Sequence, residues 1–322
     1  MDTSVMITLG FLVFAIVMFA WEKIPLSITA MVVAVGLHLS GVLSAKEAFA
    51  GFVDPNVLLF MGMFVIGEAF FATGVAVGVG NVVHKFAKTE TSLLVAVMMI
   101  TGVLSGFLSN TGTAAVLIPV IIGICKKSGF KQTKLLMPLV FAAAMGGNIS
   151  LIGAPGNMIA QAGLQQAGLG SFNFFDYGIV GLPILIVGTI FYATIGKRFL
   201  PDAPSHQPDG AFEGNDDYSH VPSWKKWTAA IILILTVVAM IFEKQLGVKL
   251  YVSAWVGALV LVATNVISET AAVKSIDMKT IMLFAGSMAL GDAMVKTGTG
   301  SVIADIIVNS LGASPSPIVV LV

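Results

Sequence analysis

Residues 91–125 read TSLLVAVMMITGVLSGFLSNTGTAAVLIPVIIGIC, an apolar run that is interrupted once, by the polar stretch 109–113. The arm that follows, 114–125, has 12 residues. At 1.5 Å per residue this arm reaches about 18 Å, which is too short to cross a hydrocarbon core of roughly 30 Å. The interruption therefore predicts a re-entrant hairpin in 91–125, with its polar tip at mid-membrane depth.

The composition places the rest of the chain in the same environment. The 322 residues are 57% hydrophobic and only 11% charged, against about 25% charged in an average soluble domain, which excludes a soluble globular protein. Seventeen basic residues balance seventeen acidic ones, so no basic surface attracts nucleic acid and such a partner is excluded. The single cysteine forms no internal disulfide, and no Cys/His cluster has the spacing of a zinc site.

Apolar stretches long enough to cross a bilayer recur along nearly the whole sequence. The first one lacks the positive region of a cleavable signal peptide, so we interpret it as a retained helix. We expect an all-α, polytopic protein of a bacterial-type inner (plasma) membrane. Its predicted spans are 4–20, 25–43, 57–73, 134–160 with a central break, 177–195, 227–242, 250–267 and 281–297.

The distribution of Lys and Arg predicts the orientation, because loops rich in these residues face the cytoplasm. The densest basic cluster without acids lies in 126–134, and we place that loop inside. Threading the spans outward leaves only four of the 17 basic residues outside, namely Lys46, Lys244, Lys249 and Lys296. The N-terminus then faces out and the linker 197–223 is cytoplasmic. The stretch 75–88, which mixes valines with basic residues, predicts an interfacial helix.

The two halves of the chain repeat at an offset of 224 residues. This shift lays 57–74 over 281–298, and it matches Gly62 with Gly286, Gly74 with Gly298, and Glu68 with Asp292. Five crossings separate the equivalent helices. An odd number inverts the second copy, which is the construction of many secondary transporters.

This repeat predicts the domain organisation. A first repeat occupies 1–196, with the hairpin 91–125 and the broken helix 134–160, and it is followed by the linker 197–223 and a partial second repeat in 224–322. The partner of the hairpin tip would fall at 333–338, past residue 322, so the second repeat is expected to be incomplete in this chain. An intact inverted repeat would need roughly 420 residues.

Polar side chains gather at the hairpin tip: three hydroxyls at spacing i, i+4 and i+8 along the first arm, and three residues in the turn. They are Thr101, Ser105, Ser109, Asn110, Thr111 and Thr113. Backbone N–H groups at the start of the second arm suit an anion, whereas carbonyls at the end of the first arm suit a cation such as sodium. The alternative is that these side chains only join helices by hydrogen bonds.

A second break lies within the span 134–160, where residues 146–157 read GGNISLIGAPGN. Non-helical backbone at membrane depth is tolerated only where protein or a water-filled cavity satisfies it, which favours a binding site. A packing kink at Pro155 is the alternative, although a kink alone needs neither four glycines nor two asparagines.

At these two motifs the sequence resembles the divalent-anion:sodium symporter family of the ion-transporter superfamily, with its citrate-transporter-like domain. Residues 109–111 match the family's Ser-Asn-Thr signature, and 146–157 resemble Gly-Gly-x-x-Thr-Leu-Ile-Gly-Thr-Pro-Pro-Asn. The chain departs from the second motif at Ser150, Ala154 and Gly156. The departure at 154 removes a hydroxyl, and with it a polar contact to the substrate.

The resemblance implies roles for individual residues. The implied substrate contacts are Asn110, Thr111, Thr113, Pro155 and Asn157. The implied sodium ligands are Ser105, Ser109, Asn110 and a backbone carbonyl at Gly153. The resemblance also implies a homodimer, in which one domain of each copy carries the site across the membrane.

We therefore expect a sodium-coupled symporter of a small anion, a di- or tricarboxylate or another divalent oxyanion such as sulfate, with Na⁺ as the coupling ion and no catalysis. A cation/proton antiporter or an oxyanion exporter of the same superfamily is the alternative, in which Glu68 and Asp292 titrate during transport. These two acids could equally serve the structure alone. An intramembrane hydrolase is not expected, because residue 289 is Ala where a presenilin-like motif before Asp292 has Gly.

Overall fold

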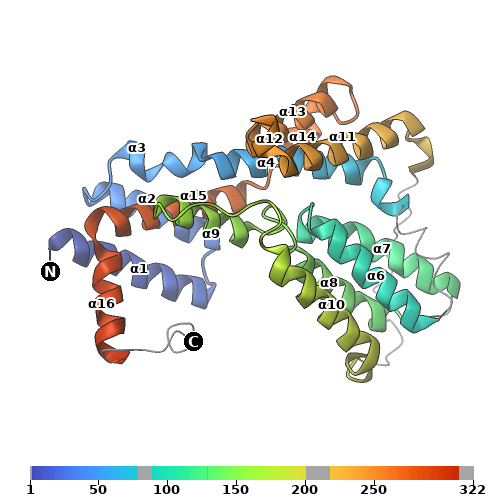
Figure 1. The fold of residues 1–322 in the computed structure, drawn as a ribbon, viewed down its shortest axis with the longest axis horizontal. Helices are drawn as coiled ribbons and strands as arrows, with labels where there is room; N and C mark the ends of the chain where they lie inside the picture. Colours follow the sequence, from blue (N-terminus) through green and yellow to red (C-terminus); the bar gives the residue numbers. More distant parts are fainter. Residues whose placement is uncertain (1, 79–88, 129, 201–217, 312–322) are drawn as a thin grey trace. The chain divides into compact units, whose positions relative to one another are not determined.

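The computed structural model describes residues 2–78, 89–128, 130–200 and 218–311 (Figure 1). Within these ranges the chain is helical and contains no β-strand. The helices there that are long and apolar enough to cross a membrane are α1 (Thr3–Trp21), α4 (Pro55–Ala72), α11 (Ser223–Ile241) and α15 (Met278–Thr297). The expected all-helical fold with several apolar helices is confirmed.

The described chain contains further helices. The apolar ones are α2 (Leu26–Leu39), α6 (Glu90–Ser105), α7 (Asn110–Ser128), α8 (Thr133–Gly146), α10 (Gly178–Thr194) and α13 (Leu250–Ala263). The others are α3 (Ala45–Ala48), η1 (Ala50–Val53), α9 (Pro155–Gln166), η2 (Gly196–Arg198), η3 (Tyr218–His220), α12 (Glu243–Leu246), α14 (Glu269–Ser275) and α16 (Thr299–Leu311). Most of the predicted interfacial helix 75–88 and most of the linker 197–223 lie outside the described residues.

The chain folds into two compact units, and each unit combines segments of both predicted repeats. Unit 1 consists of Met1–Val57, Ala162–Leu169 and Met278–Val322. Unit 2 consists of Leu58–Gln161 and Gly170–Asp277. The repeat boundaries at 196 and 223 stay predictions.

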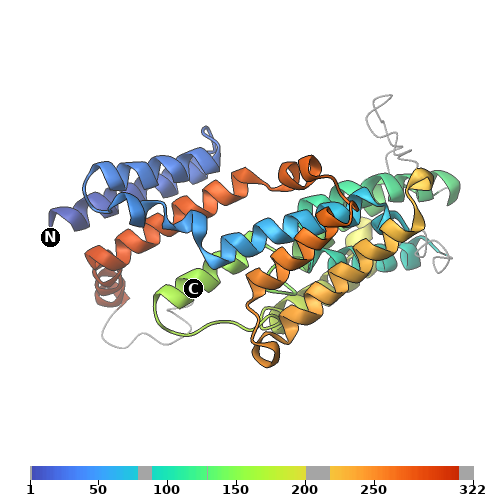
Figure 2. The same cartoon turned by 90° about the horizontal axis from the view of Figure 1, so that it is seen from above.

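Unit 1 is built on α15, which packs along α2 and α1 (Figure 2). Small residues let these backbones approach, because a Cβ on Gly286 would overlap the backbone of Ala30. The buried side chains between the helices are Ala15, Val33, Ala34, Leu37, Val42, Leu43, Ala48, Ala289 and Ala293. Such close packing is typical of helices in lipid, where van der Waals contact replaces the hydrophobic drive between helices.

In unit 2, α6, α8 and α10 pack against one another, α7 packs on α8, and α11 packs on α13. The ends of α6 and α8 meet, so these two helices run in the same direction, and α10 runs back. Their shared core is aliphatic and includes Leu93, Val97, Met98, Leu135, Leu139 and Leu185. Between α8 and α9 the helix is interrupted over 147–154, within the predicted span 134–160.

The helix that contains the hairpin's second arm is longer than the predicted apolar arm. The sequence indicated 12 residues starting at 114, whereas α7 begins at Asn110 and has 19 residues, or about 28 Å at 1.5 Å per residue. The cause is Ser109, whose Oγ accepts the N–H of Gly112 at 3.1 Å and so caps a helix that starts in the polar stretch. The apolar part of α7, Asn110–Cys125, is still among the shorter apolar helices of 10–17 residues, and the re-entrant turn stays a prediction.

Two predicted spans are longer than the helices they describe. The span 25–43 ends as α2 at Leu39, and the span 250–267 ends as α13 at Ala263. Each helix is followed two residues later by a residue in the left-handed conformation, Gly41 with φ 77° and Asn265 with φ 60°. This conformation ends a helix and turns the chain away, and hydrophobicity alone does not reveal it.

These two turns belong to a larger set of local features that recur at the 224-residue offset. α2 and α13 begin and end at offset positions, and Ser44 and Ser268 both cap the helix that follows. The hydroxyls of Thr73 and Thr297 each donate to the carbonyl four residues earlier, at 2.7 Å. Gly74 and Gly298 follow with φ 75° and 72°.

Candidate functional site

The hairpin break joins the end of α6 to the start of α7. Ser105, the last residue of α6, is fully buried, and its hydroxyl donates to the carbonyl oxygen of Ala143 in α8 at 2.7 Å. Residues 106–109 turn the chain, and α7 starts at Asn110 under the cap of Ser109. The end of α6 is therefore held against α8, just before the helix break in 147–154.

Asn110 connects the hairpin to the broken helix. Its side-chain amide faces the carbonyl oxygens of Ala143 and Gly153, each 3.1 Å away, and an amide that faces carbonyls presents its nitrogen, so Nδ2 donates to both. The same nitrogen lies 2.6 Å from Ser105 Oγ. Gly147 makes room for it, because a Cβ there would lie 2.6 Å from the Asn110 amide.

Ser150 forms a second link between the break and the hairpin. Its side chain is fully buried, and its hydroxyl donates to the carbonyl oxygen of Gly106, directly after α6. The same oxygen accepts the N–H of Ile152 at 3.2 Å. The hydroxyl therefore satisfies one backbone group on each side of the contact.

Asn157, in the first turn of α9, holds the break from the other end. Its buried side chain donates from Nδ2 to the carbonyl oxygens of Gly147 and Ser150, both at 2.9 Å. Its own carbonyl accepts the hydroxyl of Tyr177 at 2.8 Å. These bonds supply partners to non-helical backbone, which has no water to bond with inside a membrane.

Direct contact between backbones explains why glycine occupies several positions of this region. A Cβ on Gly146 would overlap the backbone of Gly102 in α6, and one on Gly181 in α10 would overlap that of Asn148. A Cβ on Gly153 would lie 3.0 Å from the carbonyl oxygen of Gly106. The end of α6, the break and the start of α10 thus meet without side chains between them.

This arrangement offers partners to both signs of charge. Helices α7 and α9 both start here, and their free N–H groups and positive dipole ends attract anions. The site also contains neutral oxygen atoms that can coordinate a cation. They are the carbonyl oxygens of Gly106, Gly147 and Gly153 and the hydroxyls of Ser105 and Ser150. Unwound backbone carbonyls of this kind coordinate Na⁺ in transporters with broken helices.

The sequence matches the family model for citrate transporters (CitMHS) over residues 16–322. The chain belongs to the citrate transporter family. Membership of this family, together with the apolar helices, identifies an integral multi-pass membrane protein.

Two of the similar proteins carry the names of transporters, and a third is named for the response to sulfur deprivation. The uncharacterized transporter YfbS of Escherichia coli is 33% identical over 65% of this chain and 35% of its own length. An uncharacterized transporter of Haemophilus influenzae is 26% identical over 93% of this chain and 67% of its own. A putative sulfur deprivation response regulator of Chlamydomonas reinhardtii is 29% identical over 51% of this chain and 28% of its own. The chain thus spans about a third of YfbS.

The structure brings together four of the residues that the sequence assigned to the site in this citrate transporter family member. Ser105, Asn110 and Gly153 are in one hydrogen-bonded network. Asn157 joins it through the carbonyl of Gly147, beside the Asn110 amide.

The remaining assigned residues lie at the edges of the network. Thr111 and Pro155 are exposed, in the first turns of α7 and α9. Thr113 is fully buried, and its hydroxyl has no partner among the described residues. The predicted hydroxyl face is wrong at Ser109, because α6 ends at Ser105 and Ser109 caps α7 instead.

Sequence reasoning missed Ser150, Tyr177 and the carbonyl of Ala143. Ser150 had a usable signal, since a hydroxyl inside a glycine-rich break must find a backbone partner when it is buried. Tyr177 and Ala143 had none, because nothing in an apolar sequence marks the carbonyl or hydroxyl that a distant side chain will reach.

The two membrane acids of the alternative function are not part of this hydrogen-bonded network. Glu68 is half-buried in the part of α4 that belongs to unit 2, and Asp292 is half-buried in α15 of unit 1. Within the described residues, neither carboxylate forms a hydrogen bond or an ion pair.

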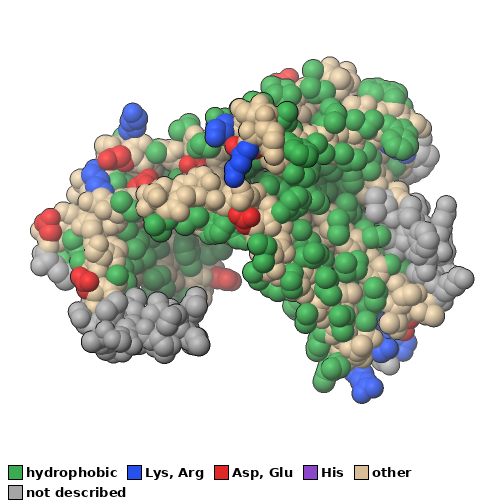
Figure 3. All heavy atoms as spheres, viewed as in Figure 1, with side chains coloured by type: hydrophobic (Ala, Val, Ile, Leu, Met, Phe, Trp, Pro, Cys, Tyr) green, Lys and Arg blue, Asp and Glu red, His purple; other side chains and the backbone are tan. Residues whose placement is uncertain are grey.

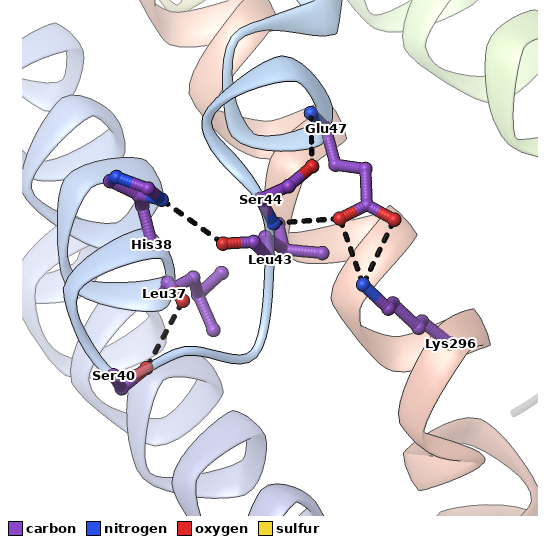
Figure 4. A network of polar contacts seen from close by, with 7 residues as sticks. All are labelled: Leu37, His38, Ser40, Leu43, Ser44, Glu47 and Lys296. Carbon is purple, nitrogen blue, oxygen red and sulfur yellow. Dashed lines mark hydrogen bonds and ion pairs between the residues drawn. The ribbon is translucent and has the colours of Figure 1, made fainter.

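A separate polar network ties α3 to α15 in unit 1 (Figure 4). Lys296 Nζ contacts both carboxylate oxygens of Glu47, at 2.8 and 2.9 Å, and the N–H of Ser44 donates to Glu47 at 2.7 Å. His38 Nδ1 lies 3.1 Å from the carbonyl oxygen of Leu43, within hydrogen-bond distance. Leu43 is in the turn between α2 and α3. The hydrogen bonds to Lys296 and Ser44 lower the pKa of the Glu47 carboxyl to about 2.

Proposed function

We propose that this protein is a sodium-coupled symporter of a di- or tricarboxylate, with citrate as the first candidate, or of another divalent oxyanion such as sulfate. The observation that carries the proposal is the side chain of Asn110. It joins the start of α7, which favours an anion, to the carbonyls of Ala143 and Gly153, which belong to the region that favours a cation. One residue therefore belongs to both the region that favours an anion and the region that favours a cation.

Coupling follows from the charges at the site. Neither 101–113 nor 146–157 contains Lys or Arg, so the positive charge beside a divalent anion comes from the co-transported Na⁺. The anion then binds more tightly when Na⁺ is present, and linkage makes this dependence mutual. Ser105 and Asn110 respond to both ligands, because their hydrogen bonds share the Ala143 carbonyl.

We also propose that the two halves form an inverted repeat. Support comes from the local features that recur at the 224-residue offset, from the bounds of α2 and α13 to the left-handed glycines 74 and 298. The hairpin arms add either no crossing or two, so the number of crossings between α4 and α15 stays odd in both cases. The inversion is therefore independent of whether the hairpin is re-entrant.

The proposed assembly is a homodimer in a bacterial-type inner membrane, with the N-terminus outside and the linker 197–223 inside. Four of the 17 basic residues then face out, as expected when cytoplasmic loops are the basic ones.

The test is uptake of labelled citrate, succinate or sulfate into proteoliposomes that contain the full-length protein, with and without an inward Na⁺ gradient. Sulfate belongs in the panel because the name of the Chlamydomonas relative concerns sulfur deprivation. Asn110→Ala leaves two carbonyls without their donor and is expected to reduce Na⁺-driven uptake by at least about tenfold. The matched control is Asn173→Ala, in an exposed loop of the same unit. Uptake of every anion that ignores the Na⁺ gradient would contradict the proposal.

The same assay distinguishes the antiporter alternative. If these acids carry protons, uptake by the wild type follows a pH gradient. Glu68→Gln and Asp292→Asn then abolish transport. A sodium symporter in which both acids are structural retains Na⁺-driven uptake in these variants, provided that the purified protein is folded.

A further inference from the structure

Unit 2 contains a cavity of about 540 Å³ at the end opposite to the helix breaks. The described residues that line it are two leucines and five polar residues, Glu90, Thr91, Lys134, Lys197 and Arg198. These residues come from three places in the sequence: the start of α6, the start of α8, and η2 directly after α10. The packing of α6, α8 and α10 therefore builds the cavity.

The cavity is cationic. Among the residues that the structure describes, three basic side chains line it against one carboxylate, that of Glu90. Lys197 reaches across from η2 to α6, where its Nζ lies 3.4 Å from the hydroxyl of Thr91. Figure 3 shows Lys and Arg side chains gathered at the end of α10, on a unit whose visible surface is otherwise largely hydrophobic.

The backbone adds to this charge. Both α6 and α8 begin at the cavity, so the positive ends of two helices point toward it. The capping box of α6 is formed by Thr89 and Ser92, which flank Glu90 and Thr91 at the cavity. Three cations, a hydroxyl and helix N-termini are the groups that bind phosphate in proteins.

The cavity is distinct from the proposed transport site. Glu90 and Ser105 are at opposite ends of α6, 15 residues apart, which corresponds to about 22 Å. If the break is at the midplane, as the proposed function requires, this distance exceeds half of a hydrocarbon core of roughly 30 Å. The cavity then lies at the level of the lipid headgroups.

We propose that this cavity binds a phosphate group, as the headgroup of an anionic phospholipid or as a soluble phosphate ester. The paired Lys197 and Arg198 and the facing Lys134 surround the phosphate, and Thr91 donates to it. The two leucines, Leu94 and Leu200, are buried and give the cavity an apolar wall for the glycerol part of such a ligand. Basic pockets between membrane helices bind lipid headgroups in this way.

The test measures thermal stability of the purified full-length protein in a non-ionic detergent. Dioleoyl phosphatidylglycerol is compared with dioleoyl phosphatidylcholine, and a separate arm uses glycerol 3-phosphate and inorganic phosphate. The key variant is Lys197→Gln with Arg198→Gln. Its matched control, Lys244→Gln with Lys249→Gln, removes the same charge from residues that do not line the cavity.

In the wild type, phosphatidylglycerol is expected to raise the unfolding temperature and phosphatidylcholine is not. Each basic side chain near an anionic lipid strengthens binding by about fivefold, so the double variant is expected to bind about thirtyfold more weakly while the control keeps its affinity. If the double variant does not fold, Lys197→Gln alone is expected to show the fivefold loss.

The outcomes separate the two sources of phosphate. Stabilisation by glycerol 3-phosphate alone, lost in the double variant, assigns the cavity to a soluble ester. Equal phosphatidylglycerol binding by wild type, double variant and control overturns the proposal, as does stabilisation by none of the probes. None of these results depends on transport, so the proposed symport can fail while this site stands.

Discussion

Gly62 in α4 lies against Ala254 in α13, so closely that a Cβ on the glycine would come within 2.8 Å of the alanine Cβ. Moved by 224 residues, the pair becomes Gly286 and Ala30, whose backbones also touch where α15 packs on α2. In each pair the glycine and the alanine come from different halves of the sequence. The same contact thus recurs at the 224-residue offset, and we expect each copy to matter to stability to the same degree.

Gly62→Ala and Gly286→Ala are each expected to lower the free energy of unfolding by about 1–3 kcal/mol, because the added methyl meets backbone that cannot rotate away. Thermal unfolding of the detergent-solubilised protein measures the loss. The control is Gly163→Ala in α9, where an added Cβ meets nothing within 4 Å, and helix propensity makes that change neutral or slightly stabilising. If Gly62→Ala and Gly286→Ala unfold at the same temperature as the control variant, the close contact is refuted.

Ser150 provides a second prediction, at the break. Ser150→Ala removes the donor to the Gly106 carbonyl, and a buried acceptor without its partner costs about 1–3 kcal/mol. Ser150→Thr keeps the hydroxyl and restores the residue of the motif that 146–157 resemble, so we expect it to retain uptake. Na⁺-driven uptake and unfolding temperature, measured on both variants, check this. Loss of uptake in the threonine variant would mean that shape, not the hydroxyl, is needed there.

The sequence was sufficient to locate the two breaks, because polar residues, glycines and a proline interrupt otherwise apolar runs. It was also sufficient to single out Asn110, the residue that joins them. It could not give the length of α7, since whether 109–113 forms a loop or a helix start depends on one bond from Ser109 Oγ to the N–H of Gly112. A single hydrogen bond of this kind does not change the hydropathy of the sequence, so hydropathy does not predict it.

Contacts between distant segments were out of reach for a different reason. Ser150 and Gly106 are 44 residues apart, and their contact depends on the direction of α6 and α8, which periodicity does not determine. The cationic cavity is a similar case. Lys134 and Lys197 were counted only for orientation, because nothing in the sequence places the start of α8 beside the end of α10.

The ion pair of Glu47 and Lys296 predicts a pH dependence. Folding lowers the pKa of Glu47 to about 2 from an ordinary value of 4.5, so the pair stabilises the folded state above pH 4.5 and this contribution is lost as the pH falls toward 2. The difference in unfolding temperature between wild type and Lys296→Gln should therefore be constant at neutral pH and shrink over that acid range. Lys46→Gln, on an exposed neighbour of Glu47, is the control. The effect should also weaken with salt, because both side chains are partly exposed.

The backbone conformations of Gly41 and Asn265 provide a test of the proposed repeat. Both follow equivalent helices with positive φ, and the N–H of the next residue bonds in each case to the carbonyl of Leu37 or Leu261 at 3.1 and 3.0 Å. An added Cβ on Gly41 meets nothing within 4 Å, so Gly41→Ala should cost only the left-handed strain, about 1–2 kcal/mol.

Asparagine tolerates this conformation better than alanine does, so Gly41→Asn should cost less than Gly41→Ala, and Asn265→Gly should be close to neutral. Asn265→Ala should then cost about as much as Gly41→Ala. Unfolding temperatures of the four variants check the order. An asparagine at 41 that destabilises as much as alanine would show that the two turns are not equivalent, and would weaken the case for the repeat.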